Sequence, residues 1–225
     1  DVAAGDDAGP AQHEFEACMA AATPRAQAAR TLADEIAFWL YSSGSTGRPK
    51  GVVHSHCNLW YTAELYAKPV LGINDKDITF SAAKLFFAYG LGNALTFPLS
   101  VGASVVLMAE RATPDATFKR WVGQTDALKA AGGVQPTVFF GAPTSFAGML
   151  ASPQLPAREA VRLRMCSSAG EALPGELAQR FKAHFGCDIV DGIGSTEMLH
   201  VFISDRPDDI RYGTTGKPVP GYEIE

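Results

Sequence analysis

The chain has 225 residues, of which 47% are hydrophobic and 19% charged, as expected for a globular protein with a sizeable core. Its formal net charge of −5 offers no basic field for nucleic acid, and no apolar run is long enough to span a membrane. Its four cysteines show no C-x-x-C spacing, which indicates free thiols and favours a cytoplasmic protein.

The first 33 residues are rich in alanine and weakly patterned, and they predict one helix over residues 15–22. From Asp34 onward, apolar runs of strand length alternate with stretches of helical length. The predicted strands are 36–41, 78–82, 104–108, 137–140, 163–167 and 188–190, and the predicted helices are 55–71, 91–101, 114–131, 143–151 and 174–185. Strands separated by helices predict an α/β fold, with a parallel sheet covered by helices on both faces.

The run YSSGSTGRPKG at residues 41–51 follows the first predicted strand, which we expect to be buried. Glycines let backbone N–H groups approach an anion, and hydroxyls and a lysine add further donors, so the run predicts a phosphate-binding loop. It is not a Walker A loop, because Pro49 precedes Lys50 and Gly51 follows it, which prevents a helix from starting there. The alternative is a flexible Ser/Gly surface turn. The candidate phosphate ligands are Ser42, Ser43, Gly44, Ser45, Thr46, Gly47 and Lys50.

Three further motifs follow along the chain, namely SAGEALP at 168–174, DGIGSTEM at 191–198 and GTTGKP at 213–218. Together with the loop at 41–51, they resemble in kind and order the motifs of acyl-adenylate-forming enzymes, a superfamily of acyl-CoA ligases, luciferases and peptide-synthetase adenylation domains. The resemblance runs from about Ile36 to Glu225. Within it, the run FFAYGLG at 86–92 is most similar to benzoate-CoA ligases.

The resemblance implies that this chain is a fragment of a longer enzyme. It implies a partial helical N-terminal segment at 1–33, an α/β adenylate-forming core at 34–200, and the start of a β-rich subdomain at 201–225. We expect residues 222–225 to open another strand. The family's small C-terminal catalytic domain with its lysine, and the aspartate that grips the ribose, would lie outside these residues.

The resemblance also implies roles for the polar motifs, which follow predicted strands where α/β sheets bind their ligands. Thr196 would donate to the α-phosphate of ATP, Glu197 would hold Mg²⁺, and Lys50 would assist at the leaving phosphates. Adenine would lie against two segments, made of Ser168, Ala169, Gly170 and Glu171, and of Asp191, Gly192 and Ile193. Ile193 stands where the family usually has tyrosine. The alternatives are a helix cap at 196–197 and a plain strand-to-helix turn at 168–171.

An aromatic acid would bind beside the flat side chains of the run 86–92. The candidate substrate residues are Phe87, Ala88, Tyr89, Gly90, Gly194 and His200. His200 would lie beside the carboxylate and donate a hydrogen bond to it. The alternatives are an aromatic core cluster and a packed histidine. His54 and His56 would share one face of a strand as a metal pair, although a solvated or packed role is favoured because no third ligand is near.

The predicted activity is ATP-dependent formation of a benzoyl-adenylate and transfer of the acyl group to coenzyme A, as in the degradation of aromatic compounds. The implied ligands are ATP, Mg²⁺, coenzyme A and an aromatic carboxylate, with no nucleic acid or membrane partner; a homodimer is left open. Two rival enzymes are an amino-acid adenylating domain and a fatty-acyl-CoA ligase. A nucleotide-binding module without catalysis is a rival of another class.

Overall fold

The computed structural model describes residues 14–43 and 47–224. The chain divides into two compact units, residues 1–32 and 33–225. In the first unit, helix α1 (Phe15–Ala21) has no buried side chain, so its helix-forming alanines rather than packing account for it. Within the described residues, no helix combines the length and the apolar character needed to cross a membrane.

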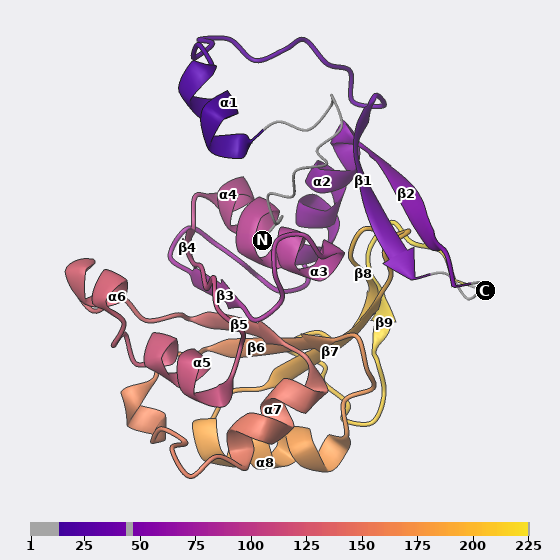
Figure 1. The fold of residues 1–225 in the computed structure, drawn as a ribbon. Coiled ribbons are helices and arrows are strands. Elements are labelled where there is room, and N and C mark those ends of the chain that lie inside the picture. The colour runs from indigo at the N-terminus through magenta and orange to yellow at the C-terminus, as the bar shows by residue number, and fades with distance from the viewer. Residues whose placement is uncertain (1–13, 44–46, 225) are drawn as a thin grey trace. The chain divides into compact units, whose positions relative to one another are not determined.

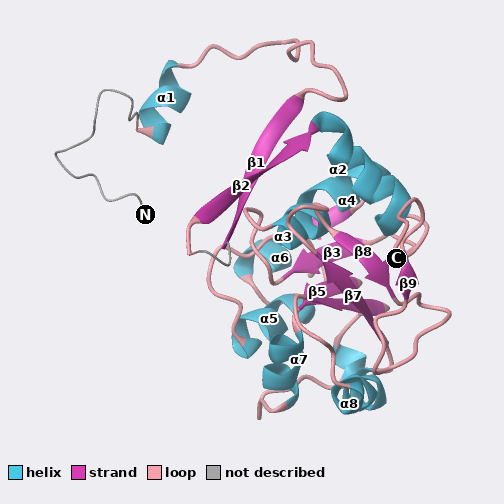
Figure 2. Cartoon of the chain, turned by 90° about the vertical axis from the view of Figure 1, so that its right-hand side faces the viewer, coloured by secondary structure: helices cyan, strands magenta, loops and turns pink. Residues whose placement is uncertain are grey.

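The second unit begins with an antiparallel hairpin of β1 (Ile36–Ser43) and β2 (Pro49–Ser55), in which Trp39 pairs with Val53 and Ser42 with Lys50. Figure 2 shows the two strands side by side. The prediction that the first strand is buried and belongs to the parallel sheet is therefore wrong. Its side chains alternate between half-buried and exposed over most of its length, as in a strand with one solvent face.

The main sheet has seven strands in the order β4-β3-β5-β6-β7-β8-β9. Their bounds are β3 (Ile78–Ser81), β4 (Ser104–Val106), β5 (Val138–Gly141), β6 (Met165–Ala169), β7 (Ile189–Gly194), β8 (Val201–Ser204) and β9 (Lys217–Pro218). The first five in spatial order are parallel, and β8 and β9 add antiparallel pairs at one edge. This confirms the predicted α/β fold. Residues 222–224 form no strand, contrary to expectation.

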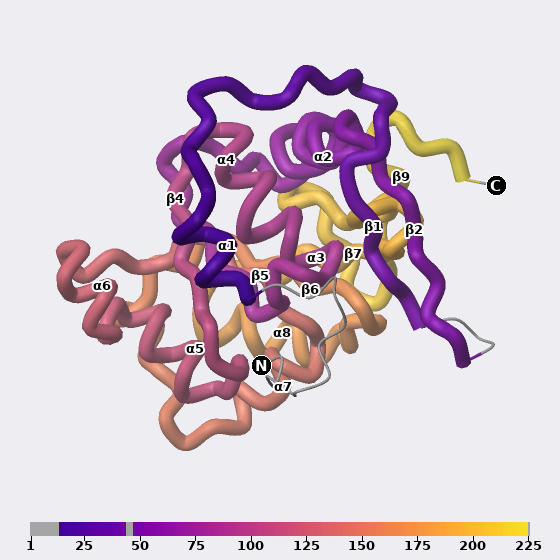
Figure 3. The backbone as a smooth tube through the Cα atoms, turned by 45° about the horizontal axis from the view of Figure 1, so that its top comes forward, coloured from indigo at the N-terminus to yellow at the C-terminus, as the bar shows by residue number. Residues whose placement is uncertain are grey.

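Helices cover both faces of this sheet, as Figures 1 and 3 show. One side carries α2 (His56–Thr62), η1 (Ala63–Ala67), α3 (Ala88–Leu91), η2 (Gly92–Thr96) and α4 (Phe97–Val101). The other side carries α5 (Pro114–Trp121), α7 (Pro143–Leu150) and α8 (Gly175–Phe185). The short helices α6 (Asp126–Ala130) and η3 (Arg158–Ala160) lie in connections. The predicted helix 114–131 is split into α5 and α6, and Gly123 between them has a φ of +67°.

The described residues form two hydrophobic cores, one on each face of the main sheet, and β5 contributes side chains to both. Phe139 packs with α5, α7 and α8, whereas Val138 and Phe140 point to the opposite face and pack with η1 and α4. Side chains alternate along a strand, so a strand buried on both faces is apolar at every position. This burial fixes the sheet between its two helical layers.

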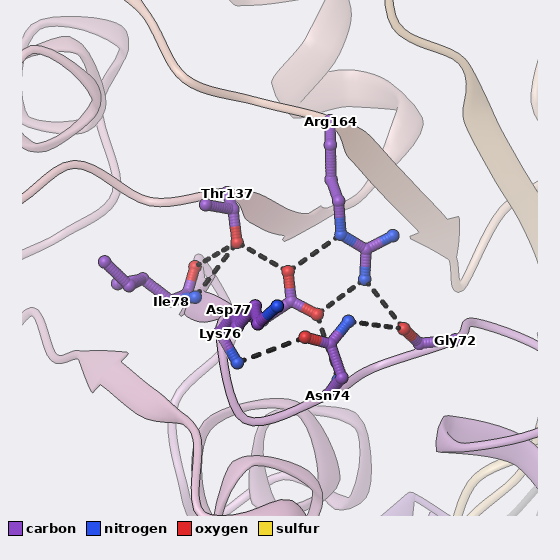
Figure 4. Close-up of polar contacts among 7 residues, drawn as sticks. All are labelled: Gly72, Asn74, Lys76, Asp77, Ile78, Thr137 and Arg164. Carbon is purple, nitrogen blue, oxygen red and sulfur yellow. Dashed lines mark hydrogen bonds and ion pairs between the residues drawn. The ribbon is translucent and has the colours of Figure 1, made fainter.

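A polar network ties together the amino-terminal ends of three strands (Figure 4). The carboxylate of Asp77, just before β3, accepts from Nε of Arg164 at 2.7 Å, from Nη2 of Arg164 at 2.6 Å and from Oγ1 of Thr137 at 2.8 Å. Arg164 also donates to the carbonyl of Gly72 at 3.1 Å. Because Thr137 precedes β5 and Arg164 precedes β6, one buried carboxylate holds three strands in register.

Candidate functional site

A cavity of about 340 Å³ lies where several parallel strands end, which is where α/β sheets bind ligands. It brings together residues from four distant parts of the sequence. Its lining consists of Ala83, Phe87, Ala88, Tyr89, Ala142, Ala169, Gly170, Gly194, Ser195, Thr196, His200 and Val201. Eight of these twelve are predicted site residues, so the structure joins the predicted aromatic segment with parts of both nucleotide motifs.

His200 is the most enclosed polar side chain of this cavity, with 3% of its surface exposed. Its ring packs against Phe97, Tyr89 and Tyr66, with centroid separations of 4.6, 5.3 and 5.4 Å. Burial lowers the pKa of His200 to about 3, so the ring is neutral at physiological pH. Its Nε2–H donates to the carbonyl of Tyr89 at 3.3 Å, and its Nδ1 has no hydrogen-bond donor among the described residues.

Two neighbours fix the surroundings of His200. A Cβ at Gly92 would lie 2.5 Å from Cδ2 of His200, so only glycine leaves room for the ring. The hydroxyl of Tyr89 lies 3.1 Å from Oγ of Ser167 on β6, which holds the phenol ring in place. The ring of Tyr89 also meets that of Phe140 edge to face at 6.2 Å.

Thr196 and Glu197 lie in a turn between β7 and β8, so the helix-cap alternative does not hold. Oγ of Ser195 accepts from the N–H of Met198 at 3.2 Å, and the N–H of Leu199 donates to the carbonyl of Thr196 at 3.2 Å. Leu199 has a φ of +65°, a conformation that L side chains rarely adopt. This strained residue lies between the Thr-Glu pair and His200, at a site where strain often accompanies function.

His54 connects the hairpin to this turn. Its Nε2–H donates to the carbonyl of Thr196 at 2.9 Å, and its Nδ1 accepts from Nδ2 of Asn58 at 3.2 Å. Burial lowers the pKa of His54. His54 lies within β2 while His56 begins α2, so the two imidazoles do not share a strand face, and the favoured packed role fits His54.

The predicted phosphate loop is the connection of the β1–β2 hairpin. Near its end Ser42 pairs with Lys50 and Ser43 pairs with Pro49, and Gly47 has a φ of +79°. Lys50 is exposed. Gly44, Ser45 and Thr46 lie outside the described residues.

The predicted adenine segments lie on adjacent strands, where Ala169 of β6 pairs with Gly192 of β7. Ser168, Asp191 and Gly192 are buried behind the cavity and do not line it. Glu171 and Ile193 are exposed beside it. Burial raises the pKa of Asp191 to about 6.

Four lining residues were not predicted, namely Ala83, Ala142, Ser195 and Val201. Ala142 follows β5 directly, so the rule on strand ends could have found it. Gly90, although predicted, is buried and does not line the cavity.

Among the described residues, no cluster of three His, Cys, Asp or Glu side chains could hold a metal by itself. Glu197 is exposed and lines a neighbouring hollow of about 420 Å³ with Asn58, Tyr61 and Met198 among others. Mg²⁺ in nucleotide sites needs only one or two carboxylates besides the phosphates, so a single Glu197 beside Thr196 fits this ion.

Comparisons with known proteins match nearly the whole chain. Residues 2–225 match the family described as AMP-binding enzyme. The chain is 56% identical over 216 residues to the benzoate-CoA ligase of Thauera aromatica, covering 96% of this chain and 39% of that protein. The chain therefore spans about two fifths of that relative's length.

Two solved structures resemble the fold closely. The benzoate-CoA ligase of Burkholderia xenovorans superposes with a TM-score of 0.85 at 61% identity, covering 97% of this chain and 42% of that one. An anthranilate-CoA ligase in complex with anthranoyl-AMP gives a TM-score of 0.76 at 44% identity, covering 88% of this chain and 36% of that one. Because the family model matches residues 2–225, nearly the whole chain, the chain belongs to the AMP-binding enzyme family.

Proposed function

We propose that the chain forms the nucleotide- and acid-binding core of an ATP-dependent aryl-CoA ligase that acts on benzoate or a close derivative. A carboxylate oxygen attacks the α-phosphorus of ATP, the bond to pyrophosphate breaks, and an acyl-adenylate results. The thiol of coenzyme A then displaces AMP to give the thioester. The observation that carries the proposal is the single cavity that joins the aromatic segment 87–89 to Ala169, Gly170 and Thr196.

The nucleotide side of the cavity is made largely of backbone and small side chains. Ala169 and Gly170 let a flat base approach the end of β6, and the hydroxyl of Thr196 can donate to the α-phosphate. Because His54 donates to the carbonyl of Thr196, the main chain that carries this hydroxyl is held in place before ATP binds. Such preorganisation is the main means of stabilising a transition state in which both reactants are anions.

The acid side of the cavity favours a ring. Phe87, Tyr89 and His200 supply flat surfaces, and Ala88 and Gly194 leave space between them. A neutral His200 whose one N–H is directed at a main-chain carbonyl serves better as an aromatic wall than as the carboxylate donor first expected. An amino-acid substrate is disfavoured because none of the described residues that line the cavity has an acidic side chain for an α-amine. Benzoate and anthranilate are the acids named for the related enzymes.

Mg²⁺ would be held by Glu197 together with phosphate oxygens, and it would neutralise charge on the departing pyrophosphate. Ser42, Ser43 and Lys50 at the end of the hairpin would hold the β- and γ-phosphates. We further propose a cytoplasmic location and the domain assignment given above. Sedimentation of the purified protein would decide whether a homodimer forms.

The test is calorimetric binding of AMP, benzoate and a non-hydrolysable benzoyl-adenylate analogue to the 225-residue chain. The benzoyl analogue should bind at least about tenfold more tightly than AMP, since burial of the ring adds to the nucleotide contacts. An octanoyl analogue and a phenylalanyl analogue serve as controls for the two rival enzymes. Equal binding of AMP and all three analogues would reduce the chain to a nucleotide-binding module.

A further inference from the structure

We propose that Lys84 is a positioning residue for the aryl-binding wall, the part of the cavity lining made by Phe87, Ala88 and Tyr89. Its side chain would hold this wall in place by binding the backbone of a neighbouring loop. The inference rests on the proposed function, because it concerns the wall of the same cavity. We name residues 82–87 the aromatic loop and residues 107–110 the anchor loop.

The aromatic loop has few buried contacts of its own. Leu85, Phe86 and Phe87 are 40%, 70% and 57% exposed, although Ala83 and Phe87 line the cavity. A loop with so little burial needs other constraints to keep one conformation.

Lys84 supplies such a constraint. Its ammonium donates to three successive carbonyls of the anchor loop, at 2.6 Å to Met108, 3.0 Å to Ala109 and 2.5 Å to Glu110. An ammonium has three N–H donors, so these contacts satisfy it completely. The three carbonyls converge on one point, which makes the contact a directed clamp rather than a chance surface pair.

The anchor loop is itself held in place. Met108 is buried in the core beneath the sheet, and Oε1 of Glu110 pairs with Nη2 of Arg120 on α5 at 2.7 Å. Arg120 also donates to the carbonyl of Ala116 at 3.0 Å. The clamp therefore connects the aromatic loop to a fixed helix.

The main chain of Lys84 transmits this position to the cavity. Its carbonyl accepts from the N–H of Phe87 at 3.0 Å. It also packs on Gly90, where a Cβ would lie 2.0 Å from that same oxygen. A shift of Lys84 must therefore move Phe87 and the start of α3, which carries Ala88 and Tyr89.

The test compares Lys84→Met, Lys84→Arg and the control Lys129→Met, an exposed lysine of α6. Lys84→Met should weaken binding of the benzoyl-adenylate analogue about tenfold and leave AMP affinity within about twofold. Lys84→Arg should restore most of the loss, and Lys129→Met should bind as wild type. Equal weakening for both ligands, or none, would overturn the proposal.

Backbone hydrogen exchange tests the clamp without any ligand. Peptides covering residues 82–91 and 107–111 should exchange faster in Lys84→Met and return to wild-type rates in Lys84→Arg. If Lys84→Met does not fold, Lys84→Gln replaces it, since its shorter amide reaches fewer carbonyls. Unchanged exchange in these peptides would refute the clamp, whereas failure of wild type to prefer the benzoyl analogue would refute the proposed function instead.

Discussion

Two buried side chains near the cavity have pKa values moved in opposite directions by burial. His200 is held neutral because a charged imidazole would lose its hydration, and Asp191 is held protonated to a higher pH for the same reason. His200 is neutral above about pH 3 and Asp191 is neutral below about pH 6, so both are uncharged together between these two values. At neutral pH His200 adds no charge to the cavity and Asp191 does not line it, so the charge there comes mainly from the ligands.

Replacement of Asp191 by asparagine should change how the free energy of unfolding depends on pH. The folded pKa of about 6 lies above that of an exposed aspartate, so the stabilising effect of protonation is full below about pH 4 and is lost as pH rises through 6. Asp191→Asn cannot ionise, so its unfolding free energy should rise relative to wild type by about 2 kcal/mol between pH 4 and 7.5. Urea unfolding at three pH values measures this, with exposed Asp208→Asn as control. A pH-independent difference would contradict the pKa assignment.

Glu197 should matter only when Mg²⁺ is present. As a proposed ligand of the ion, it needs its negative charge, which glutamine lacks. In Glu197→Gln the gain in ATP affinity on adding Mg²⁺ should fall about tenfold, while ATP affinity in excess chelator stays at the wild-type value. Calorimetry with and without Mg²⁺ measures both, and Glu159→Gln on η3 is the control. A full Mg²⁺ effect in Glu197→Gln would remove this residue from the site.

At the scale of the elements, the amino-terminal ends of β3, β5 and β6 depend on Asp77. Burial alone would raise the pKa of Asp77, but hydrogen bonds from Arg164, Thr137 and the N–H of Asn74 outweigh it and lower the pKa below its usual value. The network therefore stabilises the fold above about pH 4, and this effect is lost as pH falls through the lowered pKa.

Asp77→Asn should destabilise the chain by about 2 kcal/mol at pH 7, because Arg164 then loses its ionic partner while remaining partly shielded from water. The difference from wild type should shrink as pH falls below about 4. Denaturant unfolding at pH 7 and pH 3 measures it, with the exposed neighbour Asp75→Asn as control. Equal loss of stability in both variants would show that the network adds nothing specific.

The sequence predicted the parallel strands well because their signal is local. Phe139 and Phe140 point to opposite faces of β5, and both are apolar. This pattern can be recognised without knowing which strands lie beside β5. The hairpin was missed because β1 pairs with β2, and the sequence did not predict β2. That strand begins with Pro49, Lys50 and Gly51, which are residue types that are uncommon in strands. The break at Gly123 was likewise hidden within a helical pattern.

The sequence predicted the residues of the candidate site that have polar or aromatic side chains within motifs. It did not predict several small or apolar residues that only shape the cavity. Thr196, Tyr89 and His200 stand in recognisable motifs, whereas Ala83, Ala142 and Val201 line the cavity through position alone. The tie between His54 and the carbonyl of Thr196 joins residues 142 positions apart, and local patterns contain no trace of it.

For the whole molecule, the central question is how much of the reaction these residues can perform. The described residues that line the cavity include no lysine, and Lys50 lies at the end of the hairpin among the proposed phosphate ligands. The attacking carboxylate and the α-phosphate are both anions, so adenylation needs a cation between them. The chain spans 39% of the length of the Thauera benzoate-CoA ligase, and we propose that the catalytic lysine implied by the family resemblance lies in a part of the enzyme that this chain does not match.

The 225-residue chain by itself should therefore bind the benzoyl-adenylate analogue but not make acyl-adenylate at a useful rate. Loss of charge neutralisation at the reacting atoms costs several kcal/mol of transition-state stabilisation, so turnover should fall at least about a thousandfold. Benzoate-dependent pyrophosphate release measures this, with the complete Thauera enzyme assayed in parallel and Lys50→Ala as a check on residual activity. Turnover comparable to that of the complete enzyme would mean that a cation within these residues serves the attacking carboxylate. If Lys50→Ala then abolished that turnover, Lys50 would be the cation, and its assignment to the leaving phosphates would be wrong.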